Sequence, residues 1–502
     1  MPEVRTAQTA QSVTIPSPVG GLNGRDSLAA MSPIDAVTMD NLVPGTSRCE
    51  TRNGSVVVQN IGTAIESLFS YKGGATQKLL CGTGGKIYDA IVGGAALQSG
   101  RTGNDIVATM FSNAGSQFLI GVSGADVPFS YNGVAIANLV MTGVTGAGPT
   151  SLNSVFTFKG RLYWLQTGMP GFYYLAVGAV QGAMSYFDLA QVAARGGSVT
   201  NIGSYSLDGE SGATPQDFIV FATSEGEYIV YAGFDPSAAA NWTLVGRYYA
   251  APPIGRRAML NYGSDLYIIT SSGLLPMSAI RAPGRQEASD KALTVKLGDV
   301  LRASAVAYPS ALGWCAVEYP RAGWLVLNVP SGATVNDARI QYVMNTTTNA
   351  WCRFTGWNAL CFAVHAGKLY YGLNNGNVVE ANNGVDDNGP DGTPITVQVR
   401  QSWNNFDDDH GLGSANKQFH FATLLIGTIN APILSASMSV DFGEIAPAYI
   451  GVLQGDANTK KYTLPFSSYG EYGSLALTIV LTGSSFKWYS TKFLVTRASG
   501  LF

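Results

Sequence analysis

The chain has little charge for its size. Of its 502 residues, 30 are Lys or Arg and 33 are Asp or Glu, so 13% are charged, about half of the usual ~25%. The net charge is −3, so the chain lacks the excess of basic residues found in proteins that bind a phosphate backbone. Because 46% of the residues are hydrophobic, disorder is excluded as well. Such a surface is typical of a subunit that buries large flanks against copies of itself.

Long apolar runs and paired cysteines are also missing. The apolar runs, such as Phe218–Ala222 and Ser474–Leu481, are far shorter than the ~20 residues of a membrane span. The N-terminus lacks the apolar stretch of a secretory signal, so we expect folding in a reducing cytoplasm. Five cysteines without CxxC spacing exclude a disulfide framework and a zinc ribbon, and we expect all five to be buried apolar residues. They are Cys49, Cys81, Cys315, Cys352 and Cys361.

Catalytic motifs are absent from the sequence. There are three histidines and no GxSxG, HExxH or Walker A motif, which leaves few bases for nucleophilic catalysis. Gly82–Lys86 lies between two predicted strands, where it forms a hairpin turn and not a phosphate loop. The acidic segments Asp386–Asp391 and Asp407–His410 lack calcium-loop spacing, and we predict solvated turns. We therefore expect no catalytic residues, no metal site and no cofactor.

Glycine is abundant, with 60 residues, and it recurs in the turns of a repeated sequence pattern. A small turn residue precedes a short apolar or aromatic strand seven times, and these strand starts are on average 47 residues apart. A propeller blade of four strands occupies roughly 40–50 residues. The sequence therefore predicts an all-β fold with a degenerate β-propeller of six to seven blades over residues 61–385. The strand starts are Ile87, Phe118, Leu162, Phe218, Leu266, Trp324 and Leu369.

The two ends of the chain differ from this middle part. Residues 1–60 carry frequent Pro and Gly with scattered apolar side chains, which predicts an extended N-terminal arm that runs over other surfaces. A segment rich in turn residues at 382–394 marks a domain boundary. Six strand candidates follow it, and they predict a C-terminal antiparallel β domain over residues 386–502.

Two local patterns add detail to the middle part. Glu287–Arg302 is a helix candidate, which we interpret as an insertion between two blades although Gly298 weakens it. Tyr342–Trp351 has a Tyr, an Asn/Thr turn and a Trp, a phrase like that of a kelch blade. We expect Trp351 to pack between adjacent blades.

The order of several short motifs resembles the tail nozzle proteins of short-tailed bacteriophages, the tail tubular protein B or tail hub family. At the N-terminus the resemblance rests on Pro18–Leu28, Asp35-Ala36, Asp40–Leu42 and Arg52–Gly54. These contain a Gly-Gly-hydrophobic turn, an Asn-containing segment and an Arg-x-Gly entry into the first blade. Trp351–Ala381, followed by acidic residues and a β domain, is similar in order to that family's last blade and following domain.

The resemblance implies a structural virion component without enzymatic activity. Such proteins form six-fold rings below the portal and adaptor, with a central passage for DNA. The expected partners are five further copies, the head-to-tail adaptor, tail fibres or tailspikes, and double-stranded DNA that passes without sequence-specific binding. The expected location is the virion tail, assembled in the host cytoplasm. The expected interface residues in the arm are Gly20, Gly21, Leu22, Arg25 and Asp26.

Two alternatives stay open at this point. One is a β-propeller interaction module outside any virus, and the other is a tail-associated protein that binds or hydrolyses glycans. For a DNA conduit we also expect a neutral to negative inner wall, because a ring of basic groups would hold the phosphates. The six aspartates between residues 386 and 409 are candidates for that wall.

Overall fold

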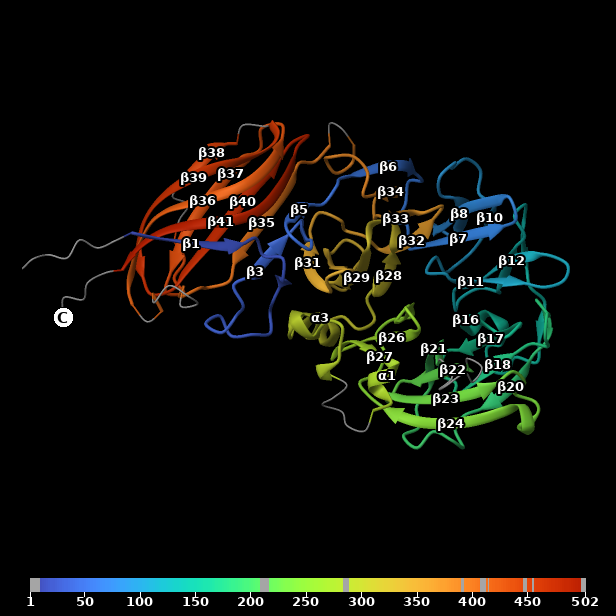
Figure 1. Ribbon diagram of the computed structural model, residues 1–502. Coiled ribbons are helices and arrows are strands. Elements are labelled where there is room, and N and C mark those ends of the chain that lie inside the picture. The colour runs from blue at the N-terminus through green and yellow to red at the C-terminus, as the bar shows by residue number, and fades with distance from the viewer. Residues whose placement is uncertain are drawn as a thin grey trace, which may run out of the picture.

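The computed structural model describes residues 10–207, 216–282, 289–389, 392–406, 412–413, 415–445, 449–453 and 456–497, without the side chains of 456–458. It is an all-β protein with 54% of its residues in strands. Two lobes lie side by side, a ring of small sheets and a sandwich of long strands (Figure 1).

Seven small antiparallel sheets, called ring sheets 1 to 7 here, follow one another along the chain. Ring sheets 1 and 2 contain β7 (Ser67–Gly73), β8 (Thr76–Thr83), β9 (Lys86–Asp89) and β10 (Gln98–Ser99), then β11 (Val107–Ser112), β12 (Gln117–Val122), β13 (Phe129–Tyr131) and β14 (Ile136–Asn138). Ring sheets 3 and 4 contain β16 (Leu152–Phe158), β17 (Arg161–Gln166), β18 (Gly171–Tyr174) and β20 (Ser185–Asp188), then β21 (Val199–Leu207), β22 (Gln216–Thr223), β23 (Glu227–Gly233) and β24 (Trp242–Tyr249). The short strands β15 (Met141–Thr142) and β19 (Gly182–Ala183) pair with each other.

The last three ring sheets complete the set. Ring sheet 5 contains β25 (Met259–Tyr262), β26 (Asp265–Thr270) and β27 (Gly273–Pro276), and ring sheet 6 contains β28 (Cys315–Tyr319), β29 (Trp324–Pro330), β30 (Arg339–Asn345) and β31 (Ala350–Phe354). Ring sheet 7 contains β32 (Cys361–His365), β33 (Lys368–Gly372), β34 (Asn377–Ala381) and β6 (Ser55–Asn60). The first strand of each sheet contacts the first strand of the next, and β32 contacts β7. The sheets therefore form a closed, propeller-like circle in which β6, from before ring sheet 1, completes ring sheet 7.

Each ring sheet contains one of the seven strand starts that the sequence indicated. Six of them lie in the second strand of their sheet, and Ile87 lies in the third strand, β9. Strand β8, the second strand of ring sheet 1, begins with the polar residues Thr-Gln-Lys. It therefore lacks an apolar residue directly after the turn, and the pattern matched the next strand at Ile87. Gly84 and Gly85, both with positive φ, form the predicted hairpin turn between β8 and β9.

The C-terminal lobe consists of two facing sheets. Its strands are β35 (Ile395–Gln401), β36 (Lys417–Ile429), β37 (Ile433–Val440), β38 (Tyr449–Val452), β39 (Asp456–Gly470), β40 (Gly473–Leu481) and β41 (Ser485–Arg497). All but β38 match the six strand candidates. The six-stranded sheet has the order β39-β36-β41-β5-β4, with β1 also paired to β41. The sheets share a core with buried residues such as Leu424, Leu477 and Trp488.

The N-terminal segment is built into both lobes. Strands β1 (Gln11–Pro16), β4 (Leu42–Pro44) and β5 (Cys49–Thr51) join the six-stranded sheet. Strand β3 (Asp35–Asp40), paired with β2 (Gly21–Leu22), lies between β31 and β35. Ring sheet 6, the strands β2 and β3, and the C-terminal strands β35, β40, β37 and β38 therefore form one ten-stranded sheet. The surfaces over which the extended segment runs belong to its own chain, as Figure 1 shows by the blue strands among the red ones.

The insertion between ring sheets 5 and 6 is less regular than we predicted. Residues 283–288 lie outside the described part, and a 3-10 turn at Val295–Leu297 ends at Gly298, whose φ of 61° does not continue a helix. Helix α3 (Val300–Ala307) begins after it, and the short α1 (Met277–Ile280) precedes the insertion. Trp351 is buried in a hydrophobic cluster that also contains Leu274 of ring sheet 5 and Leu327 of ring sheet 6, so it lies where two neighbouring sheets meet.

Candidate functional site

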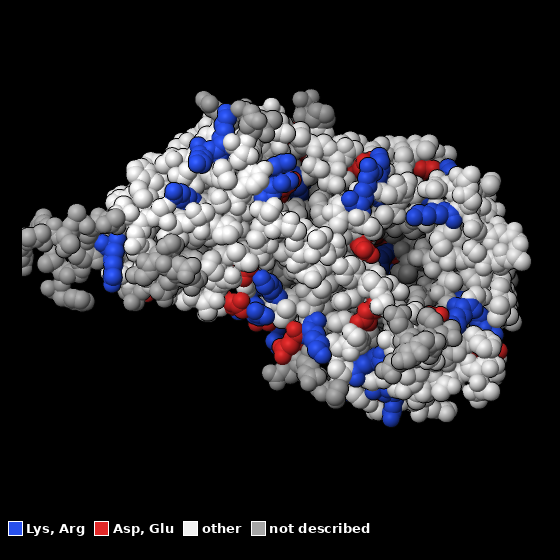
Figure 2. Space-filling model, viewed as in Figure 1, with Lys and Arg blue, Asp and Glu red and all other residues white. Residues whose placement is uncertain are grey.

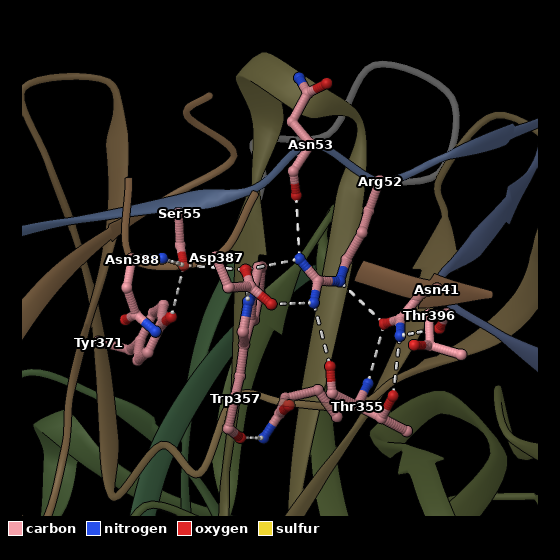
Figure 3. A network of polar contacts seen from close by, with 11 residues as sticks. Asn41, Arg52, Asn53, Ser55, Thr355, Trp357, Tyr371, Asp387, Asn388 and Thr396 are labelled. Carbon is pink, nitrogen blue, oxygen red and sulfur yellow. Dashed lines mark hydrogen bonds and ion pairs between the residues drawn. The ribbon is translucent and has the colours of Figure 1, made fainter. Parts of the chain in front are cut away.

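A buried guanidinium joins the N-terminal segment to both lobes. Arg52 follows β5 and donates hydrogen bonds from all three of its nitrogens. Nε donates to Asn41 Oδ1 (2.8 Å), and Nη2 donates to the carbonyl oxygen of Thr355 (3.0 Å). Nη1 and Nη2 donate to Asp387 Oδ1 (2.9 Å) and Oδ2 (2.6 Å). The guanidinium also lies 4.9 Å from the ring centre of Trp357. Figure 3 shows this network, which we call the Arg52 junction.

Asp387 is the acceptor at the centre of the Arg52 junction. In addition to Arg52, its Oδ1 accepts from Ser55 Oγ (2.9 Å) and from Trp357 Nε1 (3.1 Å). Tyr371 Oη lies 3.1 Å from Ser55 Oγ, and burial raises the pKa of this phenol. A buried carboxylate with four donors is a stable ionic partner because its charge is compensated by hydrogen bonds.

The prediction of solvated turns in the acidic boundary segment is therefore wrong for Asp386 and Asp387. Asp386 and Asp387 are buried, not solvated. The Asp386 carboxylate accepts from the backbone N–H of Gly483, with 2.9 Å to each oxygen. Because both carboxylates bond within the chain, these two residues are not available for the expected inner wall. Asp391 and Asp407–His410 lie outside the described residues.

The Asn41 turn positions the other side of the Arg52 junction. Asn41 has a φ of 57°, a left-handed conformation that Asn tolerates better than most residues. Its amide Nδ2 donates to Thr355 Oγ1 and to the carbonyl oxygen of Thr396, both at 2.8 Å. The preceding Asp40 accepts a bidentate pair from Arg353 at 2.6 Å. Asn41 thus holds together β4, ring sheet 6 and β35.

The five expected interface residues fall into two groups. Gly20, Gly21 and Leu22 pack inside the chain: Gly21 has a φ of 80°, and a Cβ there would lie 2.5 Å from the carbonyl oxygen of Trp351. Leu22 packs between the cores of the ring and the C-terminal lobe. Arg25 and Asp26 form an ion pair with 2.7 Å between Nε and Oδ1. They lie in the segment 24–30, where every residue except the half-buried Asp26 is exposed.

A second polar cluster lies at the centre of the ring. A cavity of about 450 Å³ is lined by first strands of the ring sheets, and Figure 2 shows a hollow there. Arg256 Nη1 donates to Asp105 Oδ2 (3.1 Å), and Arg257 donates to Asp105 Oδ1. Asn201 Nδ2 donates to the carbonyl oxygen of Arg256 (3.3 Å). Because Arg256 also donates to the carbonyl oxygen of Asn153, this segment ties ring sheets 2 to 5 together.

The charges of this cluster are compensated locally. Burial acts to raise the pKa of Asp105, but the nearby charges of Arg257 and Arg256 outweigh it and hold the pKa below its usual value. Glu66 receives a hydrogen bond from Asn104 Nδ2 (3.1 Å), and burial, with help from Asp105, raises its pKa. The Asp105 carboxylate thus faces two guanidinium groups, which is the arrangement of a structural tie.

All five cysteines are buried and free, as the sequence predicted. Burial raises the pKa of Cys49 and of Cys81 to about 12 and that of Cys315 to about 11. Among the described residues no three His, Cys, Asp or Glu side chains come together in a way that could hold a metal ion. No helix in the described ranges is long and apolar enough to cross a membrane.

Comparisons with known proteins give only distant likenesses. No family model and no curated protein matches the chain. The computationally designed Ika8 protein has a TM-score of 0.37 at 10% identity, covering 65% of this chain and 98% of that one. Raptor of Chaetomium thermophilum has 0.41 at 12% identity, covering 66% and 28%. BBS1N in complex with ARL6DN has 0.41 at 10% identity, covering 68% and 100%. Similarities at this level carry no argument about function.

Proposed function

We propose that this chain is a structural subunit of a virion tail, the nozzle or hub of a short-tailed bacteriophage. In this proposal several copies form a ring below the portal and adaptor, and the ring conducts DNA during ejection. The number of six copies comes from the resemblance alone, since a cyclic symmetry number is not encoded in one subunit. The chain has no catalytic role in this proposal.

The observation that carries the proposal is the position of the motifs behind the resemblance. Arg52 of the Arg-x-Gly motif holds Asp387, and Gly54 lies directly against the backbone of Asp386. Asp40 and Asn41 hold Arg353 and Thr355 of ring sheet 6. These short, individually unspecific motifs therefore meet at one junction between the lobes. A junction that holds the two lobes in a fixed arrangement suits a subunit that connects an adaptor to the other parts of a tail.

For the ring lobe we propose a β-propeller of seven blades, one for each ring sheet. The position of β6 in ring sheet 7 supports this. This strand from the N-terminal part of the chain pairs with β34, the last strand of the ring in sequence, and so closes the circle. The cavity at the centre, about 450 Å³ in volume and crossed by Arg256 and Arg257, has the size of a small-molecule site. In our proposal DNA therefore passes between copies of the chain and not through one propeller.

The exposed segment 24–30 is the part of the N-terminal arm that we propose to meet the adaptor or a neighbouring subunit. Its Arg25 and Asp26 pair with each other at the surface, and Leu28 is exposed. Tail fibres or tailspikes remain proposed partners without an assigned surface. The test is native mass spectrometry of the purified full chain: we expect a closed oligomer of six copies, whereas a monomer at micromolar concentration would contradict the proposal.

A further inference from the structure

The outer face of the six-stranded sheet carries a groove with an apolar floor. Its volume is about 440 Å³, and no carboxylate lines it. Phe421 on β36 is directly opposite Leu494 on β41, and Phe421 is 41% exposed. Leu425 lies further along β36 on the same face. Solvent-facing positions of an antiparallel sheet are ordinarily polar, so three large apolar side chains here indicate a face that is covered in an assembly.

Two lysines flank this floor. Lys461 is opposite Leu425, and Lys492 is opposite Thr423. No carboxylate of the described residues lies within ion-pair distance of either ammonium group. Figure 2 shows blue groups on this lobe, and the red groups visible on it lie mostly beside blue ones toward the ring. The groove thus suits an occupant that combines apolar side chains with carboxylates.

The turn after β37 has the complementary chemistry. Asp441–Ile445 reads Asp-Phe-Gly-Glu-Ile, and Phe442 and Ile445 are 44% and 41% exposed. The Glu444 side chain is 89% exposed and has Arg400 as a distant partner at 3.8 Å. Asp441 and Phe442 both have positive φ, at 48° and 63°, and such strain in non-Gly residues marks sites where shape has a function. The backbone N–H groups of Glu471 and Tyr472 fix the turn on Asp441 Oδ1, both at 2.8 Å.

We infer that the Asp441–Ile445 turn of one copy docks into this groove of a second copy. Phe442 and Ile445 cover the apolar floor, and Glu444 pairs with Lys492 or Lys461 across the interface. Because turn and groove are different surfaces, the contact is heterologous, the kind that closes into a ring when the rotation between copies allows it. This inference rests on the proposed assembly of several copies and names the contact that builds it.

A charge exchange tests this contact in the full-length chain. Lys461→Glu combined with Lys492→Glu gives a negative groove with a normal turn, and Glu444→Lys puts a positive side chain on the turn and leaves the groove normal. We expect each variant alone to sediment mainly as monomer, because like charges meet at every contact. In an equimolar mixture, alternating copies again bring opposite charges together at both kinds of contact. We therefore expect the mixture to regain the wild-type sedimentation coefficient.

The outcomes separate this inference from the proposed function. Lys86→Glu, the same change at an exposed lysine of ring sheet 1, is the control and is expected to assemble normally. Variants that assemble like the wild type, or a mixture that remains monomeric, would overturn the turn-in-groove contact while the ring itself stands. A monomeric wild type would overturn the assembly as well. As a second measurement, Phe442→Cys mixed with Leu494→Cys should form an intermolecular disulfide when an oxidant such as oxidised glutathione is added, and its absence in an assembled mixture would also contradict the contact.

Discussion

Arg52 and Asp387 lie 335 residues apart in sequence and form a buried bidentate ion pair with nitrogen–oxygen distances of 2.9 and 2.6 Å. Arg52 precedes β6, the strand that completes ring sheet 7, and Asp387 follows β34, its partner in that sheet. The ion pair therefore fastens both ends of the ring at the point where the C-terminal lobe begins. Loss of either partner leaves the other as an unpaired buried charge.

We predict that Arg52→Met lowers the free energy of unfolding by about 3–5 kcal/mol, the typical cost of breaking a buried pair. Asp387→Leu should cost a similar amount, and the double variant should cost clearly less than the sum of both. Chemical denaturation followed by tryptophan fluorescence measures this. The half-exposed pair of Arg48 and Glu50 is the control, since Arg48→Met should cost less than about 1 kcal/mol. Additive losses at positions 52 and 387 would show that the two residues act independently.

Gly21→Ala should destabilise the protein more than Gly62→Ala. Both glycines have positive φ, 80° and 93°, which costs a residue with a side chain about 1–3 kcal/mol. Only at Gly21 would the new Cβ meet other atoms, the backbone of Trp351, while nothing lies within 4 Å at Gly62. The difference between the two variants in thermal unfolding thus isolates the close contact of the N-terminal segment with ring sheet 6. Equal losses would contradict this contact.

The stability of the ring should fall on mild acidification through His365. Its Nδ1 lies 2.9 Å from Ser70 Oγ, and burial, followed by the charge of Lys72, lowers its pKa below the usual value of 6.5. Because folding lowers the pKa of this histidine, its contribution to stability is fully present above the pKa of the unfolded state. That contribution is lost as the pH falls through the pKa of the folded state. We expect His365→Gln to flatten the pH dependence of unfolding below pH 6.5. His420→Gln is the control for the loss of a histidine, and this variant should keep the pH dependence of unfolding that His365 causes.

The cysteines should be inert in the folded protein. All five are buried, and the thiolate is the reactive form. An aromatic disulfide reagent at pH 8 should therefore modify no thiol in the native protein within minutes and five thiols after denaturation. Rapid reaction of one thiol in the native state would contradict the packing around that residue.

Much of the ring was predictable because its signal is local. Each strand start that follows a glycine turn, such as Leu162 or Leu369, needs only its neighbours to form a hairpin. A continuous helix up to Arg302 was predicted wrongly because Gly298, with its positive φ, divides the segment. The strand β38 was missed because Tyr449–Val452 contains only four residues.

The Arg52 junction was not predictable from local patterns. Asp386 and Asp387 stand among Asn, Gly and Pro, the composition of a solvated turn, and their partners Gly483 and Arg52 are far away in sequence. The resemblance did single out Arg52–Gly54, but as an entry into the first blade and not as the partner of an aspartate. The turn-in-groove pair was missed for the same reason, since only the register of β36, β39 and β41 brings Phe421, Leu494 and the two lysines to one face.

We propose that copies of this chain form a tail ring with a passage between them, and electron microscopy of the purified full-length chain is the direct test. We expect end-on class averages with six equal lobes around an open centre wide enough for duplex DNA, with the C-terminal lobes in contact. Single two-lobed particles, or an oligomer without an open centre, would contradict it.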